Sequence, residues 1–187
     1  MCGWLARASA CCALALAGSV ACAQSVTQAT EQVEVRLLAA HQVVQPGQTL
    51  LVAIEQRIAP HWHTYWRNPG DSGEAMAVEW TLPAGATAGP ILWPTPHRMN
   101  VGPITNFGYS DQVTLLTELK LPSDLKEGSA ARFAAHVSWL VCHEECIPQE
   151  ATLSLALPVS GTAQVSPDAE RLDGALRALP QAMNASP

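Results

Sequence analysis

Hydrophobic and polar residues alternate along most of this chain, which is the pattern of strands with one buried face. Residues 33–37 alternate strictly, whereas residues 49–54 are apolar enough for a strand that is buried on both faces. Proline, glycine and serine interrupt the pattern at regular intervals, as turns do. We predict about seven short strands, at 33–37, 49–54, 78–82, 91–93, 113–121, 131–141 and 152–157.

Helical periodicity is weak before residue 165. Residues 167–179 can form one short helix, with Ser166 as its N-cap and Pro167 in its first turn. Short strands without intervening helices predict an all-β fold, an immunoglobulin-like antiparallel β-sandwich with long capping loops and a short C-terminal helix. A closed barrel is the alternative. Segments 60–73 and 94–111 are rich in proline, glycine and polar residues, so we predict irregular loops there.

Residues 1–23 have the features of a secretory signal peptide. Their only charge is Arg7, an apolar stretch follows it, and residues 21–23 supply the small-x-small pattern of a cleavage site. An uncleaved anchor and lipoprotein processing at Cys22 are the alternatives. We therefore expect a periplasmic protein. The predicted division is a signal peptide at 1–23, a sandwich domain at 24–160, and an extension at 161–187 with a short helix and a frayed tail.

The amino-acid composition excludes several classes of function for this chain. The 187 residues are 48% hydrophobic and only 14% charged, which argues against a disordered protein. Ten basic and 16 acidic residues give a net charge of −6, and no basic cluster exists, so nucleic acid is not an expected partner. Patterns typical of hydrolases or nucleotide-binding proteins do not stand out.

Removal of residues 1–23 leaves two of the six cysteines, Cys142 and Cys146, and one close pair in an exported protein suggests redox chemistry. Along an extended strand their Cα atoms would lie about 13 Å apart, but a disulfide requires less than about 7 Å. A bond therefore requires the strand to end near Cys142 and the chain to turn through 143–145, where the residue types permit a helical turn that Pro148 would stop. Such a small ring stabilises a fold little, which favours a reducible bond.

Two other interpretations of the pair remain open. One is a static surface disulfide, and the other is a metal site for zinc or copper. His61 and His63, at alternate positions, are candidate copper ligands, but we favour the interpretation that they belong to a polar aromatic loop packed near the cysteines. Glu144 and Glu145 oppose ionisation of a neighbouring thiol, which favours a dithiol that passes electrons on over a strong oxidant.

The cysteine segment resembles the periplasmic amino-terminal domain of the DsbD thiol:disulfide interchange family, and most closely the branch that includes the copper-sensitivity suppressor ScsB. The resemblance covers roughly residues 30–160. It rests on four ordered segments: Trp139-Leu140-Val141-Cys142 with Cys146-Ile147-Pro148, then residues 62–73, Ile91-Leu92-Trp93-Pro94, and Asn106-Phe107-Gly108-Tyr109.

The resemblance implies a sandwich whose cysteine pair shuttles electrons as a component of a protein-disulfide reductase, without a cofactor. It implies that Cys146 forms mixed disulfides and that Cys142 resolves them. The implied partners are periplasmic thioredoxin-like or disulfide-isomerase-type proteins, together with a membrane electron-transfer component that is either part of a longer protein or encoded separately. Residues expected to shield the pair or contact partners are Phe107, Tyr109, His63, Tyr65, Trp66 and His143.

DsbD itself has a longer interval between its two cysteines. The family also usually continues into a multi-span membrane domain and a thioredoxin-like domain, and neither follows in this sequence. The resemblance therefore leaves the electron donor of the pair unidentified.

Overall fold

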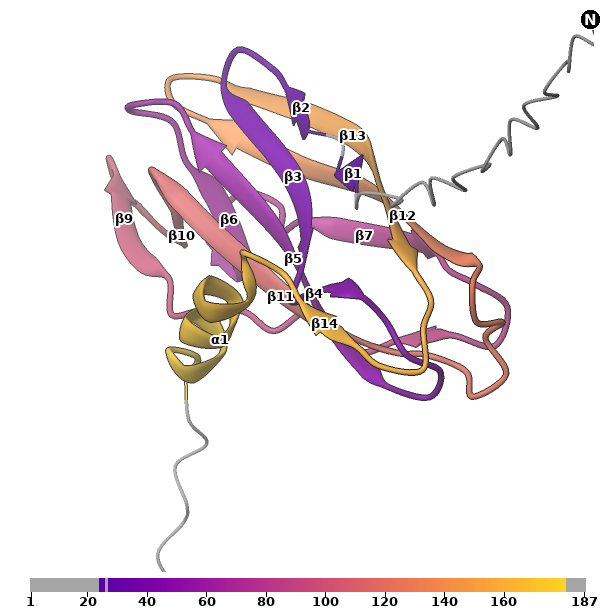
Figure 1. Cartoon of the computed structure of the whole chain (residues 1–187). Helices are drawn as coiled ribbons and strands as arrows, with labels where there is room; N and C mark the ends of the chain where they lie inside the picture. The colour runs from indigo at the N-terminus through magenta and orange to yellow at the C-terminus, as the bar shows by residue number, and fades with distance from the viewer. Residues whose placement is uncertain (1–23, 26, 181–187) are drawn as a thin grey trace, which may run out of the picture.

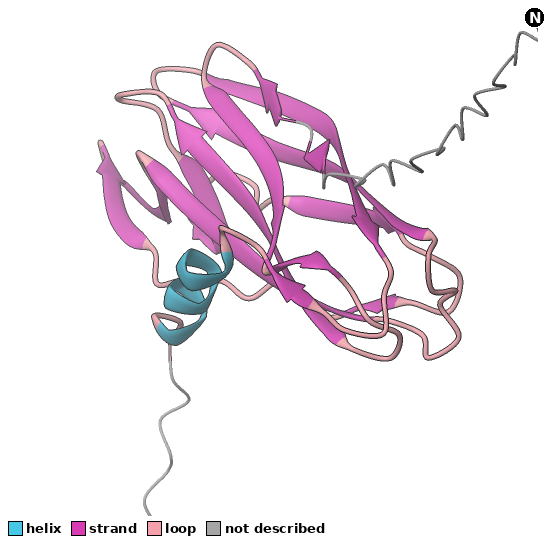
Figure 2. Ribbon diagram, in the orientation of Figure 1, coloured by secondary structure: helices cyan, strands magenta, loops and turns pink. Residues whose placement is uncertain are grey.

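A computed structural model describes residues 24–25 and 27–180, which form two packed β-layers and one helix (Figures 1 and 2). The elements are β1 (Gln24–Ser25), β2 (Thr27–Ala29), β3 (Val33–Ala39), β4 (His41–Val43), β5 (Thr49–Ile58), β6 (Thr64–Gly70), β7 (Ala77–Thr81), β8 (Thr87–Ala88), β9 (His97–Val101), β10 (Ile104–Tyr109), β11 (Gln112–Lys120), β12 (Ala130–Cys142), β13 (Cys146–Pro158), β14 (Gln164–Val165) and α1 (Ala169–Arg177).

The two layers are a four-stranded and a five-stranded antiparallel sheet. Their strand orders are β1-β13-β12-β7 and β2-β3-β5-β11-β8, and two smaller sheets, β6-β10-β9 and β14-β4, complete the domain. Every strand pairing within these four sheets is antiparallel. The predicted all-β immunoglobulin-like sandwich is confirmed.

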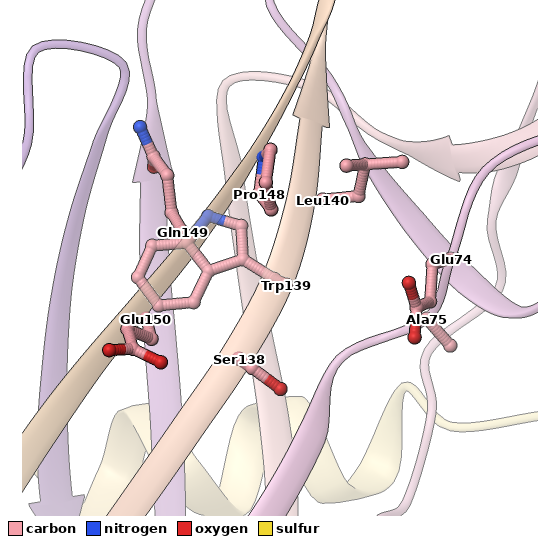
Figure 3. Close-up of a pocket in the computed structure, with 8 residues that line it drawn as sticks. All are labelled: Glu74, Ala75, Ser138, Trp139, Leu140, Pro148, Gln149 and Glu150. Carbon is pink, nitrogen blue, oxygen red and sulfur yellow. The ribbon is translucent and has the colours of Figure 1, made fainter.

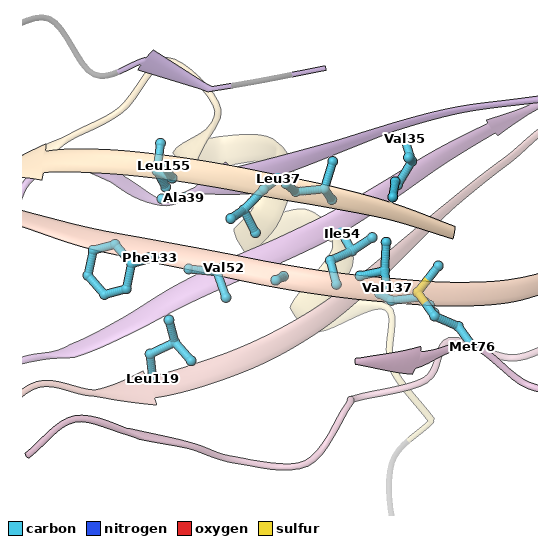
Figure 4. Close-up of a cluster of buried hydrophobic side chains, with 14 of the residues drawn as sticks. Val35, Leu37, Ala39, Val52, Ile54, Met76, Leu119, Phe133, Val137 and Leu155 are labelled. Carbon is cyan, nitrogen blue, oxygen red and sulfur yellow. The ribbon is translucent and has the colours of Figure 1, made fainter. Parts of the chain in front are cut away.

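The main core lies between the two large sheets (Figure 4). Inward-facing positions of β12, such as Phe133 and Val137, meet Val52 and Ile54 of β5, and all four are at most 2% exposed. Burial of each such side chain contributes about 1.5–3 kcal/mol relative to its exposure. The long β12 strand is therefore firmly packed along its length, including the part that leads to Cys142.

Helix α1 covers the outer face of the five-stranded sheet. Leu172 is fully buried there against Leu51, Ala53 and Leu116, which explains why β5 is buried on both faces. The predicted helix is confirmed, although it starts at Ala169 rather than at residue 167.

The capping residue of α1 also differs from the prediction. Asp168 is the N-cap and makes no side-chain capping bond. Ser166 instead accepts a hydrogen bond from the Asp168 amide and donates one to the Ala39 carbonyl. Its hydroxyl therefore ties the start of the extension to the sandwich.

The prediction of irregular loops at 60–73 and 94–111 is wrong, because β6, β9 and β10 form a three-stranded sheet there. Gly108 permits the pairing: a Cβ at this position would lie 2.0 Å from the Thr64 carbonyl oxygen. The ends of the two segments are joined by side chains, since the Asp71 carboxylate accepts the Thr105 amide and Asn106 bonds to Ser72.

Other boundaries shift by smaller amounts. The predicted strand at 91–93 is reduced to a single bridge between Leu92 and Leu116. Within the described residues, none of the helical structure is long and apolar enough to cross a bilayer. The predicted signal peptide at 1–23 and the frayed tail at 181–187 lie outside the described residues.

Candidate functional site: a disulfide at a hairpin tip

The two cysteines close the tip of a long hairpin. β12 and β13 pair in continuous register from Ala130 opposite Pro158 to Cys142 opposite Cys146, and the cysteines form a disulfide with Cα atoms 4.1 Å apart. The predicted end of the strand near Cys142 and the turn through 143–145 are confirmed. The turn is not helical, because β13 starts at Cys146 and pairs back at once.

The two sulfur-bearing residues differ in exposure. Cys142 is only 2% exposed, and its backbone exchanges two hydrogen bonds of 2.9 Å with His63, just before β6. Cys146 is exposed to solvent. Thiol–disulfide exchange requires an attacking thiolate to reach a sulfur atom, so Cys146 is the accessible side of the bond.

A tyrosine and a histidine lie behind Cys146. The Tyr65 hydroxyl is 3.9 Å from Cys146 Sγ and 3.2 Å from His63 Nε2. The Tyr65 ring lies against Gly73, where a Cβ would come within 2.2 Å of the ring and the backbone φ is +96°. Only glycine suits this position, and it allows a buried tyrosine to reach the disulfide.

Burial sets the protonation of both groups. It lowers the pKa of His63 below 6.5, and the neighbouring His143 lowers that pKa further. It raises the pKa of Tyr65 above 10.0, an effect that a hydrogen bond with Ser72 partly offsets. Both side chains are therefore neutral at pH 7.

The turn is flanked by other rings. The His143 ring lies 6.0 Å from that of His61 and 5.8 Å from that of Trp62. The residues His61 and His143 are both exposed, and the Trp62 ring packs against the main core. This arrangement leaves an aromatic and imidazole surface beside the disulfide, which suits contact with another protein.

The remaining aromatic candidates have other contacts. Phe107 packs edge-on against Trp66, with ring centroids 6.4 Å apart, and Arg67 stacks on Trp66. The buried Tyr109 donates a hydrogen bond of 2.8 Å to the Pro94 carbonyl, and its pKa is raised by burial. The shielding role of Phe107 and Tyr109 stays a prediction.

A metal site receives no support from the arrangement of the side chains. In the part of the chain that the structure describes, no three His, Cys, Asp or Glu side chains are grouped so that they could hold an ion. His63 directs its Nε2 to Tyr65, and His61 contacts His143 through its ring.

A shallow depression of about 420 Å³ runs beside the hairpin (Figure 3). Ser138 and Leu140 of β12 and Pro148 and Glu150 of β13 line it, with Glu74 from the segment before β7. Leu140 and Pro148 face each other only two residues from the cysteines. The depression therefore lies directly beside the cysteine pair.

Comparison with protein families now adds to this geometry. Residues 34–158 match the model of the family described as thiol:disulfide interchange protein DsbD, N-terminal. The chain belongs to this family. The match includes the whole β12–β13 hairpin and the β6–β10 sheet beside it, so the site described above lies within the DsbD N-terminal domain. No curated protein matches the chain.

Solved structures agree with the fold. The N-terminal periplasmic domain of ScsB from Proteus mirabilis superposes with a TM-score of 0.60 at 24% identity and covers 81% of this chain. The chain in turn spans 56% of that ScsB structure. The yeast GGA1 GAE domain gives a TM-score of 0.38 at 9% identity, over 70% of this chain and 97% of that domain. This similarity is too low to support a conclusion about the fold or the function. At this identity the ScsB domain shows a shared fold.

Proposed function

We propose that this DsbD N-terminal domain exchanges disulfides with periplasmic proteins through Cys142 and Cys146, and that Cys146 makes the intermolecular bond. Family membership supports the type of chemistry. The observation that carries the assignment is the asymmetry of the pair: Cys146 is exposed at the hairpin tip, whereas Cys142 is 2% exposed. The asymmetry gives an approaching protein access to one sulfur of the two.

The exchange balances as a two-electron transfer. The Cys146 thiolate of the reduced domain attacks one sulfur of the partner disulfide, which breaks that bond and releases the other partner sulfur as a thiolate. Cys142 then loses its proton and attacks Cys146 Sγ, which releases the second partner sulfur. The domain ends oxidised, with the bond seen here, and the partner gains two electrons and two protons.

The partners follow from the same chemistry. We expect thioredoxin-like or disulfide-isomerase-type proteins as acceptors, since each presents a reactive disulfide to an exposed thiolate. A membrane electron-transfer component is the expected donor. Export through the segment 1–23 is part of this proposal and is tested by N-terminal sequencing of the protein recovered from the periplasm.

Trapping tests which cysteine bonds the partner. A Cys142→Ala variant keeps the exposed thiol but cannot resolve a mixed disulfide, so it should accumulate covalent complexes with a thioredoxin-like protein that non-reducing electrophoresis reveals. The matched control is Cys146→Ala, which should trap little because Cys142 is buried. If only the control traps a partner, the assignment of the two roles is reversed.

A reduction potential separates exchange from a static bridge. Equilibration with glutathione or dithiothreitol buffers should give a value above about −300 mV, in the range of catalytic disulfides. A value well below this limit, combined with no trapping by either variant, would identify the bond as structural and remove the proposed function.

A further inference from the structure

The His63 imidazole, the Tyr65 hydroxyl and the Cys146 sulfur lie in a row. The hydroxyl is within hydrogen-bonding distance of both other groups, at 3.2 Å from His63 Nε2 and 3.9 Å from Cys146 Sγ. The His63 and Tyr65 rings meet edge-on, with centroids 5.2 Å apart. A hydroxyl in this position can accept a proton from one neighbour while it donates its own proton to the other.

The row is held by the backbone. His63 pairs with Cys142 through two hydrogen bonds, and Tyr65 follows it at the start of β6 opposite Gly108 of β10. Tyr65 is 3% exposed and His63 is half-buried, so the middle of the row is shielded from solvent. Neither ring depends on a flexible surface rotamer, which suits groups that must transfer a proton between fixed atoms.

We propose that Tyr65 and His63 form a proton relay for the Cys146 thiol. Tyr65 is the catalytic residue, since it touches the reacting sulfur, and His63 is a positioning residue that acts through Tyr65. This inference rests on the proposed function, because it concerns how the same cysteine pair becomes reactive once it is reduced.

The relay produces the nucleophile without an external base. The Cys146 thiol gives its proton to Tyr65 Oη while Tyr65 gives its own proton to the unprotonated Nε2 of His63. The products are a thiolate and an imidazolium, joined by a neutral phenol. The thiolate then attacks the partner disulfide, the released partner thiolate takes a proton from solvent, and His63 returns one proton to solvent.

The surrounding charges set the conditions for the relay. The turn carries His143, Glu144 and Glu145, and His61 packs against His143. Burial and His143 both lower the pKa of His63, which leaves its nitrogen free to accept a proton at pH 7. The carboxylates of Glu144 and Glu145 repel a negative charge on the Cys146 sulfur and so disfavour the thiolate. A positive charge on the His63 imidazolium offsets this repulsion.

The test is the pH dependence of Cys146 alkylation in the reduced full-length protein. Iodoacetamide is the probe, and peptide mapping by mass spectrometry follows Cys146 alone from pH 5 to pH 10. The variants are Tyr65→Phe, His63→Gln and the double variant, and the matched control is His61→Gln, which removes an imidazole that packs on His143. Circular dichroism verifies that each variant is folded.

At pH 7 we expect each single variant to react about ten-fold more slowly than the wild type and the double variant to be no slower than either. At pH 10 all four should react alike, because solvent then deprotonates a thiol whose ordinary pKa is about 8.5. His61→Gln should follow the wild type. If Tyr65→Phe does not fold, His63→Gln alone carries the test.

Unchanged rates at pH 7, equal slowing at every pH, or multiplicative losses in the double variant would each overturn the relay. The alkylation rate requires no partner protein. A domain that fails to exchange disulfides but shows this pH profile therefore disproves the proposed function and leaves the relay intact. A domain that exchanges disulfides without this pH profile disproves the relay and leaves the proposed function intact.

Discussion

Glu55 of β5 is fully buried beneath Arg171 of α1, and the two side chains form an ion pair. Arg36 of β3 binds the other oxygen of the same carboxylate at 2.6 Å. The side-chain amide of Gln112 donates a hydrogen bond of 3.0 Å to the oxygen that Arg171 binds. One carboxylate thus joins the helix to three strands of the five-stranded sheet. A buried charge with several partners is costly to disturb, since removing one side leaves the other uncompensated.

Glu55→Gln should destabilise the domain by about 2–3 kcal/mol, because it removes the charge while preserving the shape. The value lies below that of a fully enclosed pair, since Arg36 and Arg171 are partly exposed. Urea unfolding followed by tryptophan fluorescence measures it. The matched control is Glu150→Gln, whose side chain is 75% exposed and faces His136 at 3.8 Å, and its cost should be near zero. Equal costs for the two variants would contradict this account.

Leu172→Ala should cost about 2–3 kcal/mol, since it removes a fully buried side chain from the contact between α1 and the sheet. Hydrogen exchange should show faster exchange of the α1 amides and little change in β12. Leu176→Ala is the control: Leu176 is only partly buried, so this variant should lose less stability. Loss of protection throughout the sandwich would show that α1 is inseparable from the main core.

Gly108→Ala should destabilise the domain by about 1–3 kcal/mol, because the added methyl group meets the Thr64 carbonyl oxygen and pushes β6 away from β10. Tyr65 lies on β6, so the variant should also alter the environment of Cys146. Thermal unfolding and the alkylation rate of the reduced protein measure the two effects. In the control Gly161→Ala, the nearest atom is the flexible Glu127 carboxylate at 3.2 Å, and wild-type behaviour is expected.

His63 should make stability depend on pH. Its pKa in the folded protein lies below the ordinary value of 6.5 for histidine, so the unfolded chain binds a proton more readily. The stabilising contribution of neutral His63 is fully present above pH 6.5 and is lost as the pH falls through the lower, folded value. Urea unfolding between pH 8 and pH 5 should therefore show a weaker decline in His63→Gln than in the wild type. His97→Gln, at an exposed position, serves as the control and should decline as the wild type does.

The sandwich was predictable where one face of each strand is continuously apolar. β12 was expected at 131–141 and spans Ala130–Cys142, because its alternate side chains all enter one core. β5 was expected to end at residue 54, where the charged Glu55 begins a polar run, yet it continues to Ile58. Burial of Glu55 depends on Arg36 and Arg171 from distant elements, and the local pattern does not contain that information.

The candidate site, like the sandwich, was predictable only in part. If the two cysteines are bonded, their spacing requires the strand to end and the chain to turn between them, since a disulfide limits how far apart two Cα atoms can lie. The non-helical form of that turn was not predicted. The contact between Tyr65 and Cys146 joins residues 81 positions apart. It depends on the pairing of β6 with β10 and on the bridge between His63 and Cys142 at the end of β12. That pairing arises where glycine lets two backbones approach closely, and in sequence these glycines indicated only loops.

The β12–β13 ladder, not the sulfur–sulfur bond, is what brings Cys142 opposite Cys146. Twelve consecutive residue pairs precede the cysteine pair, so the ladder would keep the two thiols opposite one another once the disulfide is reduced. In the proposed exchange, each cycle would therefore start from a geometry in which the bond can reform without refolding of the hairpin.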